Sequence, residues 1–206
     1  MIHPKPNGQG QPVIITSPHR PGPAAYWHLP DQIGTFLPEG PVPASLNGIP
    51  FATWREAPTS LHGWSQVPGQ RPDLVEPPFD PQGKRPAAGL IIEEPDGRLW
   101  IVCPTNRFAG CVASFPKGRA DEGLSLQVTA IKETFEETGL RVAITGLVGD
   151  FPGVITLARY YRARRIGGTP ADMGWESQAV LLVPKNQLVA VVNLPRDQEL
   201  ARMLGG

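Results

Sequence analysis

From Pro86 onward, apolar residues occur in short blocks that are separated by turn residues. The block AAGLIIEEP is closed by Asp96-Gly97, a dipeptide typical of tight turns between antiparallel strands. The segment RLWIVCP follows as a returning strand, so the two segments predict a β-hairpin. A loop over Thr105–Gly110 and a third strand, CVASFP, then lead the chain to Lys117-Gly118.

The next block has helical spacing instead. Apolar Leu126, Ala130 and Ile131 fall on one face, Ser125 is a plausible N-cap, and Gly139 stands where a C-terminal cap belongs. Three further strands are expected in RVAITGLVGDF, VITLARYYRAR and SQAVLLVP, and a terminal helix in NLPRDQELARMLGG. Strands and helices in this order are typical of an α/β fold, with a mixed sheet and helices on its faces.

The first 85 residues differ from the rest in amino-acid composition, because 18 of the 25 prolines lie at or before Pro86. Proline at this density excludes long helices and central strands. One interpretation is a disordered tail, but Trp27, Trp54 and Trp64 are costly to leave in water. We therefore expect a proline-rich N-terminal arm over 1–85, with a short strand near Ile49–Trp54. The arm would wrap a catalytic domain over 86–206 or a second subunit.

Composition narrows the class of protein. Among 206 residues, Lys plus Arg and Asp plus Glu both number 19, which gives no reason to expect a nucleic-acid or membrane partner. The sequence has no apolar run that could span a bilayer, and its first residues lack the apolar core of a secretory signal. Cys103 and Cys111 are the only cysteines, which favours a reduced, cytoplasmic location and structural thiols.

Candidate chemistry is concentrated in GRADEGLSLQVTAIKETFEETGL, residues 118–140. Glu133, Glu136 and Glu137 are spaced so that their carboxylates share a helix face. Clustered carboxylates repel one another unless a cation lies between them, and all-oxygen ligation suits Mg²⁺ or Mn²⁺. The alternative is a solvated acidic face, as most charge runs are. The region after Pro86 contains no histidine, so any general base there must be another group.

The same stretch resembles the Nudix box, a pattern of Gly, five residues, Glu, seven residues, and Arg-Glu-apolar-any-Glu-Glu-any-Gly-apolar. The positions that match in register are Gly118, Glu133, Glu136, Glu137, Gly139 and Leu140. Leu124 replaces the first Glu, Lys132 the Arg, and Thr134 the apolar residue. The resemblance implies a Nudix-like α/β/α sandwich with a mixed sheet.

The resemblance also implies roles for individual residues. Glu136 and Glu137 would hold the metal, helped by a backbone carbonyl at Lys117 or Gly118, and Glu133 would be a further ligand or the general base. Lys132 keeps the charge of the expected Arg but not its planar fork. Asp121 and Glu122 lie close enough in sequence to compensate for the carboxylate that Leu124 lacks.

Three residues outside the core of the box are further candidates. Glu176 precedes a strand, at a place where Nudix relatives often carry an additional carboxylate, and is either an extra ligand or base or a surface acid. The segment Pro116-Lys117-Gly118 resembles the sequence that leads into the box in some Nudix members that act on dinucleoside polyphosphates. Lys117 would then bind substrate; the alternative is that its side chain is simply solvated. Arg159 lies in a predicted strand that is rich in arginine and tyrosine. It would either bind phosphate groups of the substrate or belong to a charged, solvent-exposed strand edge.

These observations predict a Nudix hydrolase that uses Mg²⁺ or Mn²⁺ to split a nucleoside diphosphate linked to another group. Its partner would be a small nucleotide or organic pyrophosphate, and the chain could form a homodimer. The alternative is a catalytically weak Nudix-like module that binds or senses a nucleotide. A third hypothesis is a scaffold whose proline-rich arm docks into aromatic grooves.

Overall fold

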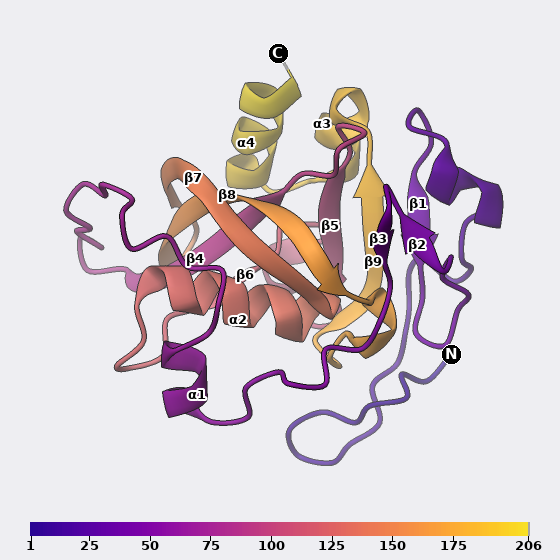
Figure 1. Cartoon of the computed structure of the whole chain (residues 1–206), viewed down its shortest axis with the longest axis horizontal. Helices are drawn as coiled ribbons and strands as arrows, with labels where there is room; N and C mark the ends of the chain where they lie inside the picture. The colour runs from indigo at the N-terminus through magenta and orange to yellow at the C-terminus, as the bar shows by residue number, and fades with distance from the viewer. Residues whose placement is uncertain (206) are drawn as a thin grey trace.

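The computed structural model describes residues 1–205, and Figure 1 shows the arrangement of their elements. The strands are β1 (Gly34–Phe36), β2 (Ser45–Leu46), β3 (Ile49–Pro50), β4 (Arg85–Ile92), β5 (Leu99–Pro104), β6 (Lys117–Arg119), β7 (Leu140–Pro152), β8 (Thr156–Gly168) and β9 (Ser177–Val183). The α-helices are α1 (Leu61–Ser65), α2 (Leu126–Thr138), α3 (Leu188–Val191) and α4 (Pro195–Gly205). Short 3₁₀ turns cover Ala24–His28, Phe108–Gly110, Pro170–Asp172 and Lys185–Gln187. No helix within this range is both long and apolar enough to cross a membrane.

The strands form two main sheets. One has the order β6-β4-β8-β7, in which β4 and β8 run parallel and the other neighbours are antiparallel. The second has the order β1-β9-β5 and is antiparallel throughout. The strands β2 and β3 form a small separate pair.

Helices cover the strands from two sides, which gives the molecule three layers. The helix α2 contributes Val128, Ala130 and Ile131 to one hydrophobic cluster, together with the arm. The other cluster contains Leu200 and Leu204 from α4. In Figure 1, α4 accordingly lies above the strands β7 and β8, and α2 lies below them. The predicted α/β fold with a mixed sheet is confirmed.

The caps that the sequence predicts for α2 are also confirmed. The Ser125 hydroxyl accepts a hydrogen bond from the Val128 backbone N–H at 3.2 Å. At the other end Gly139 adopts a left-handed conformation with φ of 69°, and its N–H donates to the Phe135 carbonyl at 2.7 Å. These caps fix where the glutamate-bearing helix begins and ends.

Two expectations about strands were wrong. The strands β4 and β5 flank the Asp96-Gly97 turn but separate into different sheets, joined only by a bridge between Glu93 and Leu99. Both are buried on both faces, so each finds its neighbours elsewhere. The segment CVASFP is not a strand: Ser114 makes a single bridge to Val102, and the edge strand comes later, at β6. Ala113 and Phe115 of this segment pack into the core without a ladder.

The N-terminal arm packs against the part of the chain that follows Pro86. The side chains of Trp27, Trp54 and Trp64 are all buried. The Trp27 ring lies 5.9 Å from that of Trp100, and the Trp54 ring lies 5.2 Å from that of Phe135 on α2. Burial of this much aromatic surface supplies the favourable term that holds a proline-rich segment in place.

Polar contacts attach the arm as well. Arg98 is only 1% exposed, and its guanidinium donates to the backbone carbonyls of Tyr26 at 2.8 Å and Trp27 at 2.5 Å. It also pairs with Asp96 at 2.8 Å. At the sheet edge, β1 adds to β9 with Gly34 opposite Leu182. The arm therefore completes the second sheet.

Candidate active site

A large cleft in the described part of the chain has a volume of about 1130 Å³. It lies where β4 and β8 begin and β5 ends, beside the edge strand β6 and α2. Its charged lining residues are Arg85, Lys117, Arg119, Asp121, Glu133, Glu137, Glu176 and Arg196. Gly118, Glu133 and Glu137 of the box therefore share one cavity with several cations from other elements, whereas Glu136 is not among its lining residues.

Glu133 lies against the glycine that opens the box. A Cβ atom added to Gly118 would overlap the Glu133 carboxylate, so an alanine there would force this side chain to move from its place. Burial, followed by repulsion from Glu137 and Glu136, raises the pKa of Glu133 to about 8. The carboxylate is thus held next to the β6 backbone without a cation to balance it.

Glu137 is the most deeply buried of the three glutamates. Its Oε2 accepts a hydrogen bond from the backbone N–H of Lys117 at 2.8 Å, which ties α2 to β6. Burial raises the pKa of Glu137 to about 7, against the opposing effect of the Lys117 charge and hydrogen bond. Lys117, expected to bind substrate, lines the cleft and supplies this backbone contact.

Glu136 is exposed and faces a different partner. Lys132 donates to Glu136 at 2.9 Å, one helical turn away, and also pairs with Asp121 at 3.1 Å. Burial opposes the charge of Lys132, but the hydrogen bond and charge of Glu136 outweigh it and raise the pKa of the amine. The lysine that replaces the box arginine therefore links α2 to the preceding loop and holds Glu136.

Glu176 lies in the loop before β9 and lines the same cleft. Its backbone carbonyl accepts from the Thr105 N–H at 2.8 Å, and the Gly174 N–H donates to the Glu136 carbonyl at 2.6 Å. Burial, then repulsion from Glu136, raises the pKa of Glu176. The loop is thus fixed to the end of α2, and the structure brings Glu176 towards the box glutamates.

The donor set fits a hard divalent cation in its chemistry. Glu133 and Glu137 are carboxylates in a cleft, and the only side-chain amine on α2, that of Lys132, pairs with other acids. Burial is the main cause of their raised pKa values, and the charges of Lys132 near Glu133 and of Lys117 near Glu137 offset it only in part. Within residues 1–205, however, no three carboxylate, thiol or imidazole side chains stand close enough together to hold a metal as they are arranged.

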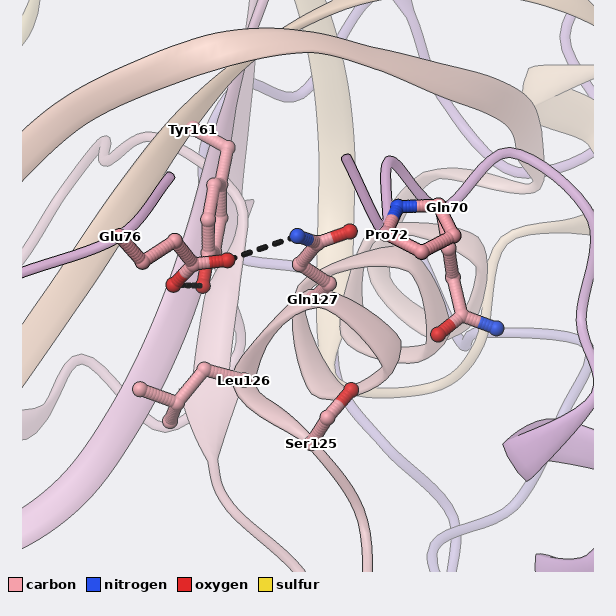
Figure 2. A pocket seen from close by; sticks show the side chains of 7 residues that line it. All are labelled: Gln70, Pro72, Glu76, Ser125, Leu126, Gln127 and Tyr161. Carbon is pink, nitrogen blue, oxygen red and sulfur yellow. Dashed lines mark hydrogen bonds between the residues drawn. The ribbon is translucent and has the colours of Figure 1, made fainter. Parts of the chain in front are cut away.

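Arg159 lies elsewhere. Its guanidinium bonds both oxygens of Asp150 at 2.7 Å and reaches Glu76 of the arm at 3.0 Å. Figure 2 shows that Glu76 also accepts from Tyr161 at 2.8 Å and from Gln127 at 2.7 Å. Arg159 is thus not among the residues that line the large cleft, and the structure places it in the attachment of the arm.

The network in Figure 2 borders a second cavity of about 350 Å³ between the arm and the start of α2. Its lining is formed by Gln70, Pro72, Glu76, Ser125, Leu126, Gln127 and Tyr161. The charged and amide groups that face it already bond to one another. This cavity is therefore a seam between arm and domain.

Sequence reasoning missed the cations and apolar groups that other elements bring to the cleft. Arg196 begins α4, Arg85 begins β4, and Phe108 comes from the loop after β5. None of them belongs to the box, and nothing in the local pattern marks them. The only signal was the pair of opposite charges, Arg196 and Asp197, at the start of an otherwise ordinary helix.

The fold and this cleft define a mixed α/β domain with an acidic helix beside a glycine-bounded edge strand. Residues 83–202 match the model of the NUDIX domain, and the chain belongs to this family. Its acidic box lies within the matched range.

Two curated relatives align with parts of the chain. An RNA pyrophosphohydrolase of Caulobacter vibrioides is 39% identical over 72 residues, which cover 35% of this chain and 41% of that protein. A Mycobacterium tuberculosis protein named MutT4 is 28% identical over 130 residues, covering 57% of this chain and 52% of its own length. The chain thus spans about half the length of the curated relatives it matches or less.

Among solved structures, an ADP-ribose pyrophosphatase from Streptococcus suis 89-1591 is 21% identical, with a TM-score of 0.47. The alignment covers 59% of this chain and 87% of that one.

Proposed function

We propose that this chain is a pyrophosphohydrolase that uses Mg²⁺ or Mn²⁺ to cleave a nucleoside diphosphate linked to another group. The observation that carries the proposal is the placement of Glu133 and Glu137 in the large cleft. One carboxylate fills the space left by Gly118 and the other is bonded to the Lys117 backbone. A site built this closely around two buried carboxylates serves a cation-dependent reaction better than a solvated helix face.

In this proposal Glu133, Glu136 and Glu137 hold the metal, with Glu176 and a backbone carbonyl of β6 as further donors. The ion, when bound, neutralises phosphate charge and lowers the pKa of water. Lys117 attracts the substrate phosphates into the cleft. Lys132 keeps Glu136 turned towards the loop that precedes α2, through the ion pairs described above.

Hydrolysis also needs a proton acceptor, because water must lose a proton as it attacks phosphorus and the bridging oxygen leaves. Glu133 and Glu176 are the two candidates, since both line the cleft and both have a raised pKa, whereas Glu137, which shares these properties, is bonded to the Lys117 backbone. A base whose pKa lies near the working pH transfers protons most effectively. Glu133 is therefore either a ligand or the base, and substitution with pH-resolved kinetics separates the two roles.

The test is release of phosphate from a panel of pyrophosphate substrates, with Mg²⁺ or with excess chelator. Glu137→Gln keeps the shape but not the charge, and we expect it to lower kcat by about 10²–10⁴-fold. Glu199→Gln is the matched control, because Glu199 is an exposed acid on α4 that does not line the cleft. Full turnover in chelator, or equal rates for both variants, would contradict the proposal.

The same panel addresses the alternative of a nucleotide-sensing module. A sensor would bind one of these nucleotides in calorimetry without hydrolysing it, and Glu137→Gln would leave binding in chelator unchanged. Leu124→Glu gives a further check, since it restores the carboxylate that the box lacks. We expect it to change kcat much less than Glu137→Gln, because Leu124 packs partly into the core and does not line the cleft.

A further inference from the structure

Arg196 is a buried cation in the wall of the active-site cleft. Its side chain lines the cleft, yet the residue is only 7% exposed. The surface cations Arg85 and Arg119 line the same cleft but are exposed. Burying a guanidinium is costly unless its donors are used, so the position of Arg196 calls for a partner.

The structure satisfies only part of the guanidinium. Its Nε and Nη2 contact the carboxylate of Asp197 at 3.2–3.3 Å, and its Cζ lies 5.7 Å from the centre of the Tyr160 ring. Within residues 1–205, Nη1 donates no hydrogen bond. A Cβ atom added to Gly153, in the turn between β7 and β8, would stand 3.0 Å from Nη1. Glycine thus keeps the space beside the free nitrogen open.

Asp197 and Tyr160 fix the direction of this side chain. Asp197 is fully buried at the start of α4, and Tyr160 is fully buried on β8. The guanidinium is therefore held from one side by a carboxylate and from another by a ring, with Nη1 left for a ligand. A pre-oriented arginine of this kind suits phosphate oxygens.

Arg196 reaches the cleft from the layer opposite to the glutamates. The helix α4 packs in one hydrophobic cluster and α2 in the other, so the two helices flank the cleft from different sides. The phosphates on either side of the cleaved bond belong beside Glu133, Glu137 and Lys117. An anion bound at Arg196, on the α4 side of the cleft, would then be a further one.

We infer that Arg196 binds a phosphate beyond the two that flank the cleaved bond, so that the site favours small nucleotides with three or more linked phosphates. This inference rests on the proposed function for the location of the cleaved bond. The exposed Phe108, Val154 and Ile155 at the rim of the cleft offer apolar surface to the nucleoside end of such a ligand. Arg196 acts as a specificity-determining residue here.

The test compares wild-type protein with the double variant Arg196→Gln/Asp197→Asn. Both charges are removed together, because Arg196→Gln alone would leave Asp197 buried without its partner. Arg202→Gln is the control, since Arg202 is an exposed arginine on the same helix. The substrates are a nucleoside triphosphate and a nucleoside diphosphate sugar. We expect the double variant to lose about 10- to 100-fold in kcat/KM on the triphosphate and to keep its rate on the sugar nucleotide.

Calorimetric measurement of the binding of inorganic tripolyphosphate and of pyrophosphate separates the proposed function from the inferred phosphate site at Arg196. If wild-type protein hydrolyses neither nucleotide but binds tripolyphosphate through Arg196, the proposed function is wrong and the recognition of the extra phosphate stands. Equal losses on both nucleotides would overturn the inference, as would tripolyphosphate binding that the double variant leaves unchanged. Circular dichroism of the double variant checks that it is folded, and an unfolded variant is replaced by Arg196→Lys, which keeps the charge but loses the fork.

Discussion

Arg98 gives a sharp test of how the N-terminal arm is attached. The proposed change is Arg98→Met, which keeps an unbranched side chain but removes every donor. Its guanidinium now serves the carbonyls of Tyr26 and Trp27 and the carboxylate of Asp96. Removing one member of a buried ion pair costs about 3–5 kcal/mol, because the partners stay behind without compensation.

The free energy of unfolding of an ordinary domain is about 5–15 kcal/mol, so a loss of this size is measurable without abolishing the fold. Urea unfolding followed by tryptophan emission is the assay, since Trp27 is buried beside Trp100. Arg162→Met is the control, because Arg162 is exposed on β8. A loss below about 1 kcal/mol for Arg98→Met, the range of surface ion pairs, would refute this account of the arm.

Three further predictions concern the site and the core. In chelator, the melting temperature should fall as pH rises from about 5 to 8. The reason is that Glu133, whose pKa in the native state is about 8, keeps its proton after the unfolded chain has released it near pH 4.5. In thermal-shift measurements, Glu133→Gln should make the melting temperature depend less on pH. Gly118→Ala should lower kcat by about 10²-fold or more, because it displaces the Glu133 carboxylate. Gly146→Ala is the control, since a Cβ atom at Gly146 would meet no other atom and kcat should stay unchanged. Equal rates for the two variants in the phosphate assay would contradict the prediction. Burial raises the pKa of Cys103 to about 12, so we expect this thiol to react with a disulfide reagent only on unfolding, and rapid labelling of the native protein at Cys103 would count against its buried position.

The helix that carries the box could be predicted because its signals are local. Ser125 and Gly139 act on backbone groups within a few residues, and the spacing of the glutamates follows from helical geometry alone. Strand pairing is different. The Asp96-Gly97 turn was visible in the sequence, but it does not decide that β4 pairs with β8 while β5 pairs with β9. That choice depends on burial of both faces, which involves segments far away.

The same distinction explains the candidate site. Glu133 and Glu137 could be chosen from the sequence because the box places them on one helix. Arg159 and Arg196 could not be told apart, since each is an arginine in an ordinary strand or helix. Only the fold turns Arg159 towards Asp150 and the arm, and brings Arg196 to the cleft.

The pairing of β1 with β9 has a consequence for the order of events during synthesis. Gly34 lies opposite Leu182, so the first strand in the described part of the chain must wait for its last strand, β9, before it can pair. At typical rates of synthesis that wait is on the order of 10 s. Contacts this distant in sequence also slow folding in general. During the interval Phe36 and Trp27 have no core to enter, which makes the nascent arm the natural client of a chaperone.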